Sequence, residues 1–168
     1  MISMIIFIIT FFGDLIVRIV LNPGAWSPDL LLLSVLYITL NRPLGEAYLY
    51  AFLAGLCWDS VFFEIPGTHS LLFILAAMIT AKLRLVIWAQ FSISRLVIGV
   101  LAVVFVRFGE VIFWLSYLEY EIPLILPYKY ILYGSIVTGI CFMIYPMLFL
   151  PIQSILQKNT QPMIFLGR

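Results

Sequence analysis

Long apolar runs, separated by glycine, proline and charged residues, divide this chain into six candidate helices. These segments cover about residues 2–21, 28–40, 44–63, 68–81, 95–117 and 131–150. A helix that crosses a bilayer needs about 20 residues, so the second and fourth segments are short for a span. The pattern predicts an all-α membrane protein: a six-transmembrane-helix bundle that forms one integral membrane domain over residues 1–168.

The breaks between the runs contain residues that typically start helices. Ser27 is a good N-cap, Pro28 suits the first helical position, and Asp29 favours the positive end of the helix dipole. We therefore expect a helix to start at Pro28. Pro66 and Gly67 form a second turn signal, after which the fourth segment starts.

Composition supports the assignment to a membrane. Of the 168 residues, 64% are hydrophobic and 10% are charged, whereas a soluble domain is about half apolar and about a quarter charged. The formal net charge of +1 provides no basic footprint for a phosphate backbone. A soluble globular domain, a disordered tail and a nucleic-acid-binding protein are therefore excluded. Cys57 and Cys141 lie in apolar runs and are expected to be buried hydrophobes.

The distribution of Lys and Arg predicts the orientation of the bundle. With six spans and both termini in the cytoplasm, the inner segments carry most of the cations: Arg42, Lys82, Arg84, Arg95, Lys158 and Arg168. The outer loops then carry only Lys129, which is a strong positive-inside bias. The inner cations, Arg42 among them, are expected to face anionic membrane lipid or a cytoplasmic partner. Trp58 falls near an outer span end, where interfacial tryptophans gather.

Charged residues inside a span are costly, so they are expected to face protein rather than lipid. Asp14 and Arg18 stand four residues apart on the first helix, and Arg107 and Glu110 stand three apart on the fifth. The members of each pair share a helix face and can form an ion pair. Either the two pairs neutralise themselves and fix helix contacts, or they form a polar relay or a ligand site.

A stripe of small residues marks the third segment. Ala47, Ala51 and Gly55 recur every four residues, a spacing that lets another helix backbone approach closely. That backbone belongs either to this chain or to a partner. Asp59 continues the stripe, so we expect it to point into the bundle or toward a partner. There it either binds a partner or substrate group, or hydrogen-bonds to a neighbouring helix start, such as the one near Thr68.

Sequence features of catalysis and metal binding are absent. The chain contains no GxGxxG, GxxxxGK[ST], HExxH or GxSxG motif. His69 is the only histidine, and no second His or Cys stands at metal-ligand spacing. We therefore expect no enzyme, no metal and no cofactor. The candidates for polar contacts, with a partner or within the bundle, are Asp29, Arg42, Asp59 and His69.

Four short motifs occur in order between Trp26 and Arg84. They are a W-x-P-D start before a leucine-rich run, an Arg42-Pro43 turn followed by Gly45, an A-G-L-x-x-D segment that ends in Asp59, and a P-G-x-H motif that ends in His69. With these motifs in this order and spacing, the stretch resembles the MreD family of rod shape-determining proteins. The rest of the chain matches that family in hydropathy.

The resemblance implies a non-enzymatic scaffold of the bacterial cell-elongation machinery in the inner membrane. It implies binding to MreC, a single-span periplasmic protein, and through MreC to the MreB filament and the peptidoglycan polymerase and transpeptidase pair. It also implies a fold similar to the substrate-binding subunits of energy-coupling-factor transporters. Such a vitamin-binding subunit is the alternative function, in which Asp59 and His69 would line an outer pocket. A small proton-coupled transporter, with Asp14, Arg18 and Glu110 along a water path, is a further alternative.

Overall fold

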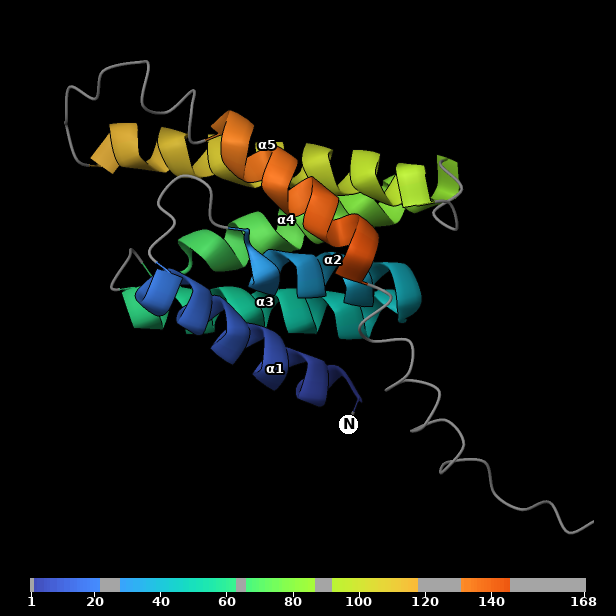
Figure 1. Ribbon diagram of the computed structural model, residues 1–168, viewed down its shortest axis with the longest axis horizontal. Coiled ribbons are helices and arrows are strands. Elements are labelled where there is room, and N and C mark those ends of the chain that lie inside the picture. The colour runs from blue at the N-terminus through green and yellow to red at the C-terminus, as the bar shows by residue number, and fades with distance from the viewer. Residues whose placement is uncertain (1, 22–27, 63–65, 87–91, 118–130, 146–168) are drawn as a thin grey trace, which may run out of the picture.

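The computed structural model describes residues 2–21, 28–62, 66–86, 92–117 and 131–145, and every element in these ranges is helical. The helices are α1 (Ile2–Ile16), its π-helical continuation η1 (Val17–Leu21), α2 (Leu30–Asn41), α3 (Leu44–Phe62), α4 (Thr68–Val86), α5 (Ser92–Tyr117) and a last helix, Ile131–Tyr145. Figure 1 shows them packed beside one another in one bundle.

α2 is the central helix of the bundle. Its residues from Leu31 to Thr39 are all buried, and it packs against α1, α3 and α4. A helix that is apolar on every side is expected to be covered on every side, which explains why this segment has no polar face. α3 and α4 pack along each other, and α5 lies against α4.

Each of the six predicted segments coincides with a helix, although several ends differ. The fourth helix, predicted at about residues 68–81 or longer, is the longer of these alternatives, because α4 continues through Arg84. Lys82 and Arg84 do not stop the helix, since long cationic side chains at a helix end extend beyond it. Arg84 Nη1 donates to the carbonyl oxygens of Thr39 (3.2 Å) and Leu40 (3.1 Å) at the end of α2.

The predicted helix start at Pro28 is wrong. α2 begins at Leu30, and Asp29 occupies the N-cap position without a side-chain hydrogen bond to its own helix. The Asp29 carboxylate contacts two arginines from other helices instead. The expected cap, Ser27, lies outside the described residues.

The fifth helix differs from the prediction in length. α5 begins at Ser92, before the predicted Arg95, and has 26 residues. At about 1.5 Å per residue this length exceeds a hydrocarbon core of about 30 Å. The last helix is described as far as Tyr145, so residues 146–150 of the predicted sixth span lie outside the described residues.

Two of the described helices are long and apolar enough to cross a membrane. They are α1 with its π-helical continuation (Ser3–Val20) and α5 (Ile93–Phe113). α2 and the last helix are apolar but shorter, and α3 and α4 have 19 residues each with a more polar composition. Length and composition within the described residues therefore identify two candidate spans.

The bundle carries large apolar side chains outside and charged side chains inside. Exposed apolar side chains occur on α1, α3, α4, α5 and the last helix, for example Phe12, Leu49, Leu71, Phe108 and Ile144. By contrast, Asp14 is 0%, Arg107 is 1% and Asp59 is 3% exposed. Soluble proteins show the opposite distribution, since ionised side chains are almost never fully buried unless they are paired. The distribution is the one expected of helices surrounded by lipid.

Successive helices run in opposite directions. At one end of the bundle, Ser3 at the start of α1 donates to Glu46 at the start of α3, and Arg84 near the end of α4 meets the end of α2. At the other end, Asp29 before α2 contacts Arg18 in η1, and Asp59 near the end of α3 contacts the start of α4. This alternation brings charged residues that are far apart in the sequence to one end of the bundle.

Candidate functional site

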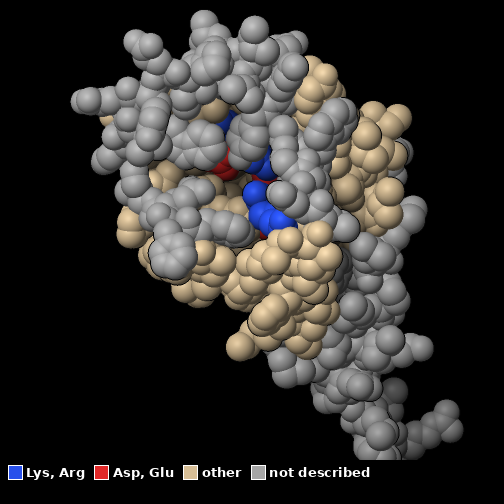
Figure 2. Space-filling model, turned by 60° about the vertical axis from the view of Figure 1, so that its left-hand side comes forward, with Lys and Arg blue, Asp and Glu red and all other residues tan. Residues whose placement is uncertain are grey.

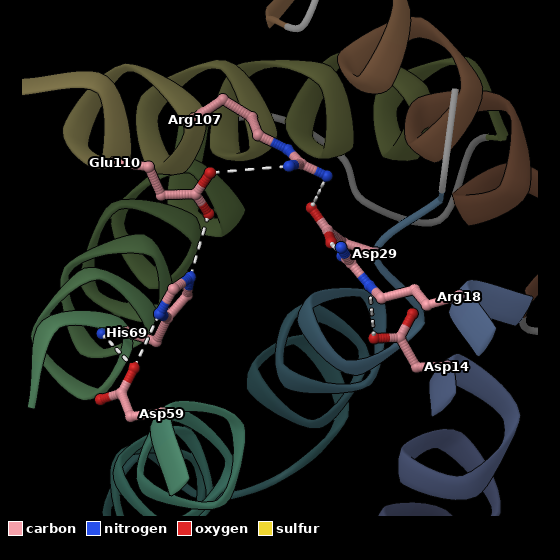
Figure 3. A network of polar contacts seen from close by, with 7 residues as sticks. All are labelled: Asp14, Arg18, Asp29, Asp59, His69, Arg107 and Glu110. Carbon is pink, nitrogen blue, oxygen red and sulfur yellow. Dashed lines mark hydrogen bonds and ion pairs between the residues drawn. The ribbon is translucent and has the colours of Figure 1, made fainter. Parts of the chain in front are cut away.

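Seven ionisable side chains, carried by elements from α1 to α5, form one continuous network near one end of the bundle (Figure 3). In order of contact they are Asp14, Arg18, Asp29, Arg107, Glu110, His69 and Asp59. Acidic and basic groups alternate along this order. The Arg18 side chain is 22% exposed, and each of the other six is 10% exposed or less.

The first part of the network joins α1 to the start of α2. Arg18 Nε lies 3.5 Å from Asp14 Oδ2, and Arg18 Nη2 also donates to Asp29 Oδ1. Asp14 Oδ1 accepts a hydrogen bond of 3.1 Å from the backbone N–H of Leu30, the first residue of α2. The first N–H groups of a helix have no partner within it. The Asp14 carboxylate of α1 therefore caps the start of α2, a role that the sequence analysis predicted for Ser27.

Arg107 connects the start of α2 to α5. Its Nη2 lies 2.7 Å from Asp29 Oδ2, and its Nη1 lies 3.5 Å from Glu110 Oε2. The backbone N–H of Asp29 also donates to Thr138 Oγ1, at 3.2 Å, in the last helix. A buried guanidinium needs carboxylate partners to offset the loss of water, and Arg107 obtains one from its own helix and one from α2.

His69 and Asp59 form the other part of the network, at the junction of α3 and α4. His69 Nδ1 lies 2.7 Å from Asp59 Oδ1, and His69 Nε2 lies 3.2 Å from Glu110 Oε1. Asp59 also accepts hydrogen bonds from the backbone N–H groups of Gly67 (2.7 Å) and His69 (3.2 Å). Of the two roles considered for Asp59, the structure contains the contacts of the second, a hydrogen bond to a neighbouring helix start.

Trp58 lies near the end of α3, as predicted, but its indole packs against the network and does not face outward. The indole is 5% exposed. The Arg18 guanidinium carbon lies 4.3 Å from the centre of the Trp58 ring, a cation–π distance, and the His69 ring centre is 5.9 Å away. Phe73 meets the His69 ring at 5.8 Å, nearly edge-on. These rings cover one side of the Arg18 and His69 groups, and hydrogen bonds beside such apolar surfaces are stronger than in water.

The small-residue stripe packs within this chain. Ala47 and Ala51 are 0% exposed. A Cβ atom added at Gly55 would lie 2.3 Å from the backbone nitrogen and Cα of Ser70, so only glycine permits this approach of α3 to α4. Ser70 Oγ also donates to the Phe52 carbonyl oxygen, at 3.1 Å. The stripe was expected to pack against a helix of this chain or of a partner. In the structure Gly55 packs against α4 of the same chain.

The network combines four carboxylates with two guanidinium groups and one imidazole. Among these seven described residues, the carboxyl groups therefore outnumber the guanidinium groups. Figure 2, which looks toward this end of the bundle, shows a hollow with atoms of basic and acidic side chains inside it. No group of three His, Cys, Asp or Glu side chains within the part of the chain that the structure describes has the arrangement of a metal site.

A comparison with models of protein families decides the family. The model described as rod shape-determining protein MreD matches residues 1–157. The chain belongs to the MreD family. The match confirms the family predicted from the sequence motifs, and it extends well beyond the stretch that carries them. No protein with a curated description matches the chain, and no solved structure matches it.

Membership of the MreD family assigns the chain to the determination of rod shape. MreD proteins are membrane proteins, which agrees with the apolar exterior of the bundle and its two candidate spans. They are shape-determining proteins and not a known family of enzymes. The similarity to energy-coupling-factor transporter subunits receives no support, because no solved structure matches.

The MreD-like motif residues fall into two places. Asp29, Asp59 and His69 belong to the network, whereas Arg42 lies at the opposite end of the bundle. Arg42 is half-buried at the C-cap of α2, where its backbone N–H donates to the Ile38 carbonyl oxygen at 2.8 Å. The four candidates therefore do not form one site. Trp26, the first motif residue, lies outside the described residues.

Sequence reasoning anticipated the contacts within a helix and one contact between helices, that of Asp59 with the start of α4. It missed the other contacts between helices. Nothing in the sequence indicated that His69 would meet Glu110, that Asp14 would reach Leu30, or that Thr138 would meet Asp29. One available signal was the number of ionisable residues in apolar runs, since each of them needs a buried partner.

Proposed function

We propose that this MreD-family chain is a non-enzymatic scaffold of the cell-elongation machinery, with one six-span integral membrane domain in the bacterial inner membrane. It binds MreC and, through MreC, couples the MreB filament to the peptidoglycan polymerase and transpeptidase pair. The observation that carries the proposal is the match of the MreD family model to residues 1–157.

The placement of the cations supports an orientation with both termini in the cytoplasm. Arg42, Lys82, Arg84 and Arg95 stand where α2 and α4 end and where α3 and α5 begin. By the positive-inside rule this end faces the cytoplasm, where it meets anionic lipid and filament-associated proteins. The charged network then lies in the half of the bundle nearer the periplasm.

A scaffold must keep its helices in one arrangement, and lipid gives no hydrophobic gain for joining them. Close packing and polar contacts must supply the cohesion instead. The contact of Gly55 with Ser70 is an example of close packing, and the buried ion pairs are polar contacts. Since the small-residue stripe is occupied inside the bundle, the MreC helix packs on an outward apolar face. α1 offers a broad one, where Ile9, Phe12 and Ile16 are 48%, 57% and 59% exposed.

A photo-crosslinking scan in living cells tests the binding of MreC. A crosslinking amino acid replaces one outward residue at a time: Ile9 on α1, Leu101 on α5 or Ile140 on the last helix, all exposed. We expect a crosslink to MreC from α1, with the other two faces as matched controls. A scan without any MreC crosslink, together with failure of MreC to co-purify, would contradict the binding and leave the family assignment intact.

Cell shape tests the scaffold role independently. Deletion of the gene in a rod-shaped host should give wide or round cells, and the full chain should restore rods. Normal rods after deletion, with normal placement of the peptidoglycan polymerase, would contradict the coupling function.

A further inference from the structure

His69 has a carboxylate oxygen at each of its two ring nitrogens. Nδ1 lies 2.7 Å from Asp59 Oδ1, and Nε2 lies 3.2 Å from Glu110 Oε1 (Figure 3). The side chain is buried, and its two partners come from α3 and α5 while His69 itself belongs to α4. The ring therefore bridges three helices through two acidic groups.

A neutral imidazole cannot satisfy this geometry alone. It carries one N–H donor, and its other nitrogen offers only a lone pair. If Nδ1 donates to Asp59, the lone pair of Nε2 points at Glu110, and an ionised carboxylate has only lone pairs as well. Such a contact is repulsive, and more so in a buried site than in water. An additional proton between Nε2 and Glu110 Oε1 converts the repulsion into a hydrogen bond.

We propose that Asp59, His69 and Glu110 form a proton-binding site, which holds one proton more than a neutral imidazole between two carboxylates. The proton lies in the contact between Nε2 and Glu110, as an imidazolium that donates to the carboxylate or as a carboxylic acid that donates to the ring. Because the two groups are coupled, the proton belongs to the pair. The proposal is independent of the binding of MreC.

The surrounding charges agree with a bound proton. Asp59 of α3 and Glu110 of α5 touch the ring, and Asp29 before α2 and Asp14 of α1 lie further along the network. Two cations oppose the proton: Arg107 of α5, which contacts Glu110 at 3.5 Å, and Arg18 of η1, which stacks on Trp58. These are the charged groups of the described elements around the ring. Among these described groups the carboxyl groups outnumber the guanidinium groups, which favours an extra proton.

The proton makes the link between α4 and α5 sensitive to pH. Its loss leaves the contact of Nδ1 with Asp59 intact and breaks that of Nε2 with Glu110. The folded chain then binds one proton more than the unfolded chain at neutral pH, so folding weakens as the pH rises. For one proton the unfolding equilibrium constant increases up to about tenfold per pH unit.

Nitrogen NMR of the full chain in lipid nanodiscs tests the site directly. His69 is the only histidine, so ¹⁵N-histidine labelling of an untagged chain reports on this ring alone. At about pH 8 a free imidazole is neutral, whereas we expect both ring nitrogens of His69 to carry hydrogen. In Glu110→Gln the amide donates to a neutral Nε2, so that variant should show a neutral ring at the same pH. Glu46→Gln, at the opposite end of the bundle, should match the wild type.

Infrared spectroscopy of the same samples locates a proton that resides on the acid. A neutral ring together with a protonated carboxyl band that disappears in Glu110→Gln would support the site, with the proton on Glu110. A neutral ring without such a band in the wild type would overturn it. The wild-type measurements need no variant to fold. Where Glu110→Gln does fold, its unfolding should depend less steeply on pH than that of the wild type, and equal slopes would also contradict the proposal.

Discussion

Arg107 Nη2 lies 2.7 Å from Asp29 Oδ2, and this contact joins the two parts of the charged network. Asp29 stands at the N-cap of α2 and Arg107 lies within α5, two helices that otherwise pack against each other only sparsely. On the Asp29 side the network continues to α1, and on the Arg107 side it continues to α4 and α3. Arg107 therefore links the two parts of a network that reaches from α1 to α5.

Replacing Arg107 with Met should destabilise the protein more than any change at the opposite end of the bundle. Breaking a buried ion pair from one side costs about 3–5 kcal/mol, because the remaining carboxylates stay buried without compensation. Unfolding in detergent micelles measures the loss, and Lys82→Met, at an exposed position of α4, is the control. The double change Asp29→Asn with Arg107→Met should cost less than the sum of the single changes. Strict additivity would mean that the contact contributes nothing.

Gly55→Ala should destabilise the bundle although it adds one methyl group. The new Cβ would overlap the Ser70 backbone, and α3 and α4 would have to separate. Overpacking of this kind costs about 1–3 kcal/mol. Gly45→Ala is a matched control on the same helix, because a Cβ at Gly45 meets nothing within 4 Å. Equal stability of the two variants in the same unfolding assay would show that the α3 and α4 backbones have room for a methyl group at Gly55.

Asp59→Ala should loosen the start of α4 before it affects the rest of the bundle. The change removes the acceptor for the backbone N–H groups of Gly67 and His69, and loss of a helix cap costs about 0.5–2 kcal/mol. Asp59→Asn keeps one acceptor oxygen and should lose less. Hydrogen exchange at these two amides measures the effect. Unchanged protection in Asp59→Ala would remove the capping role.

Single cysteines should be labelled from opposite sides of the membrane at Gly45 and Pro66. Both positions are exposed and stand at opposite ends of α3 and the turn that follows it. In a chain with Cys57 and Cys141 replaced by Ala, a membrane-impermeant reagent applied from the periplasm should label Cys at 66 and spare Cys at 45. Labelling of both, or the reverse pattern, would contradict the proposed orientation.

The sequence predicted which segments are helical because each apolar run is bounded by residues that break helices. It also placed Asp14 and Arg18 correctly on one helix face, since a spacing of four residues is a local property. The start of α2 was predicted two residues too early, because it depends on a contact with another helix. Its first N–H group is satisfied by Asp14, which belongs to another helix, so local capping preferences carried no information about it.

The network as a whole could not be predicted from one sequence. The contact of His69 with Glu110 joins residues that are far apart in the chain, and periodicity does not describe such pairs. Asp59 was the partial exception. Its position beyond the small-residue stripe indicated that it faces α4 or a partner, because a helix face continues from Gly55 to the residue four positions later.

The two oxygens of the Asp29 carboxylate acquire their partners at different times during synthesis. Arg18, the partner of Oδ1, precedes Asp29 in the chain, whereas Arg107, the partner of Oδ2, is synthesised only with α5. Until then the growing chain holds an Asp29 carboxylate with only one of its two arginine partners. The order of synthesis therefore means that the pairing of Asp29 is complete only after α5 has been translated.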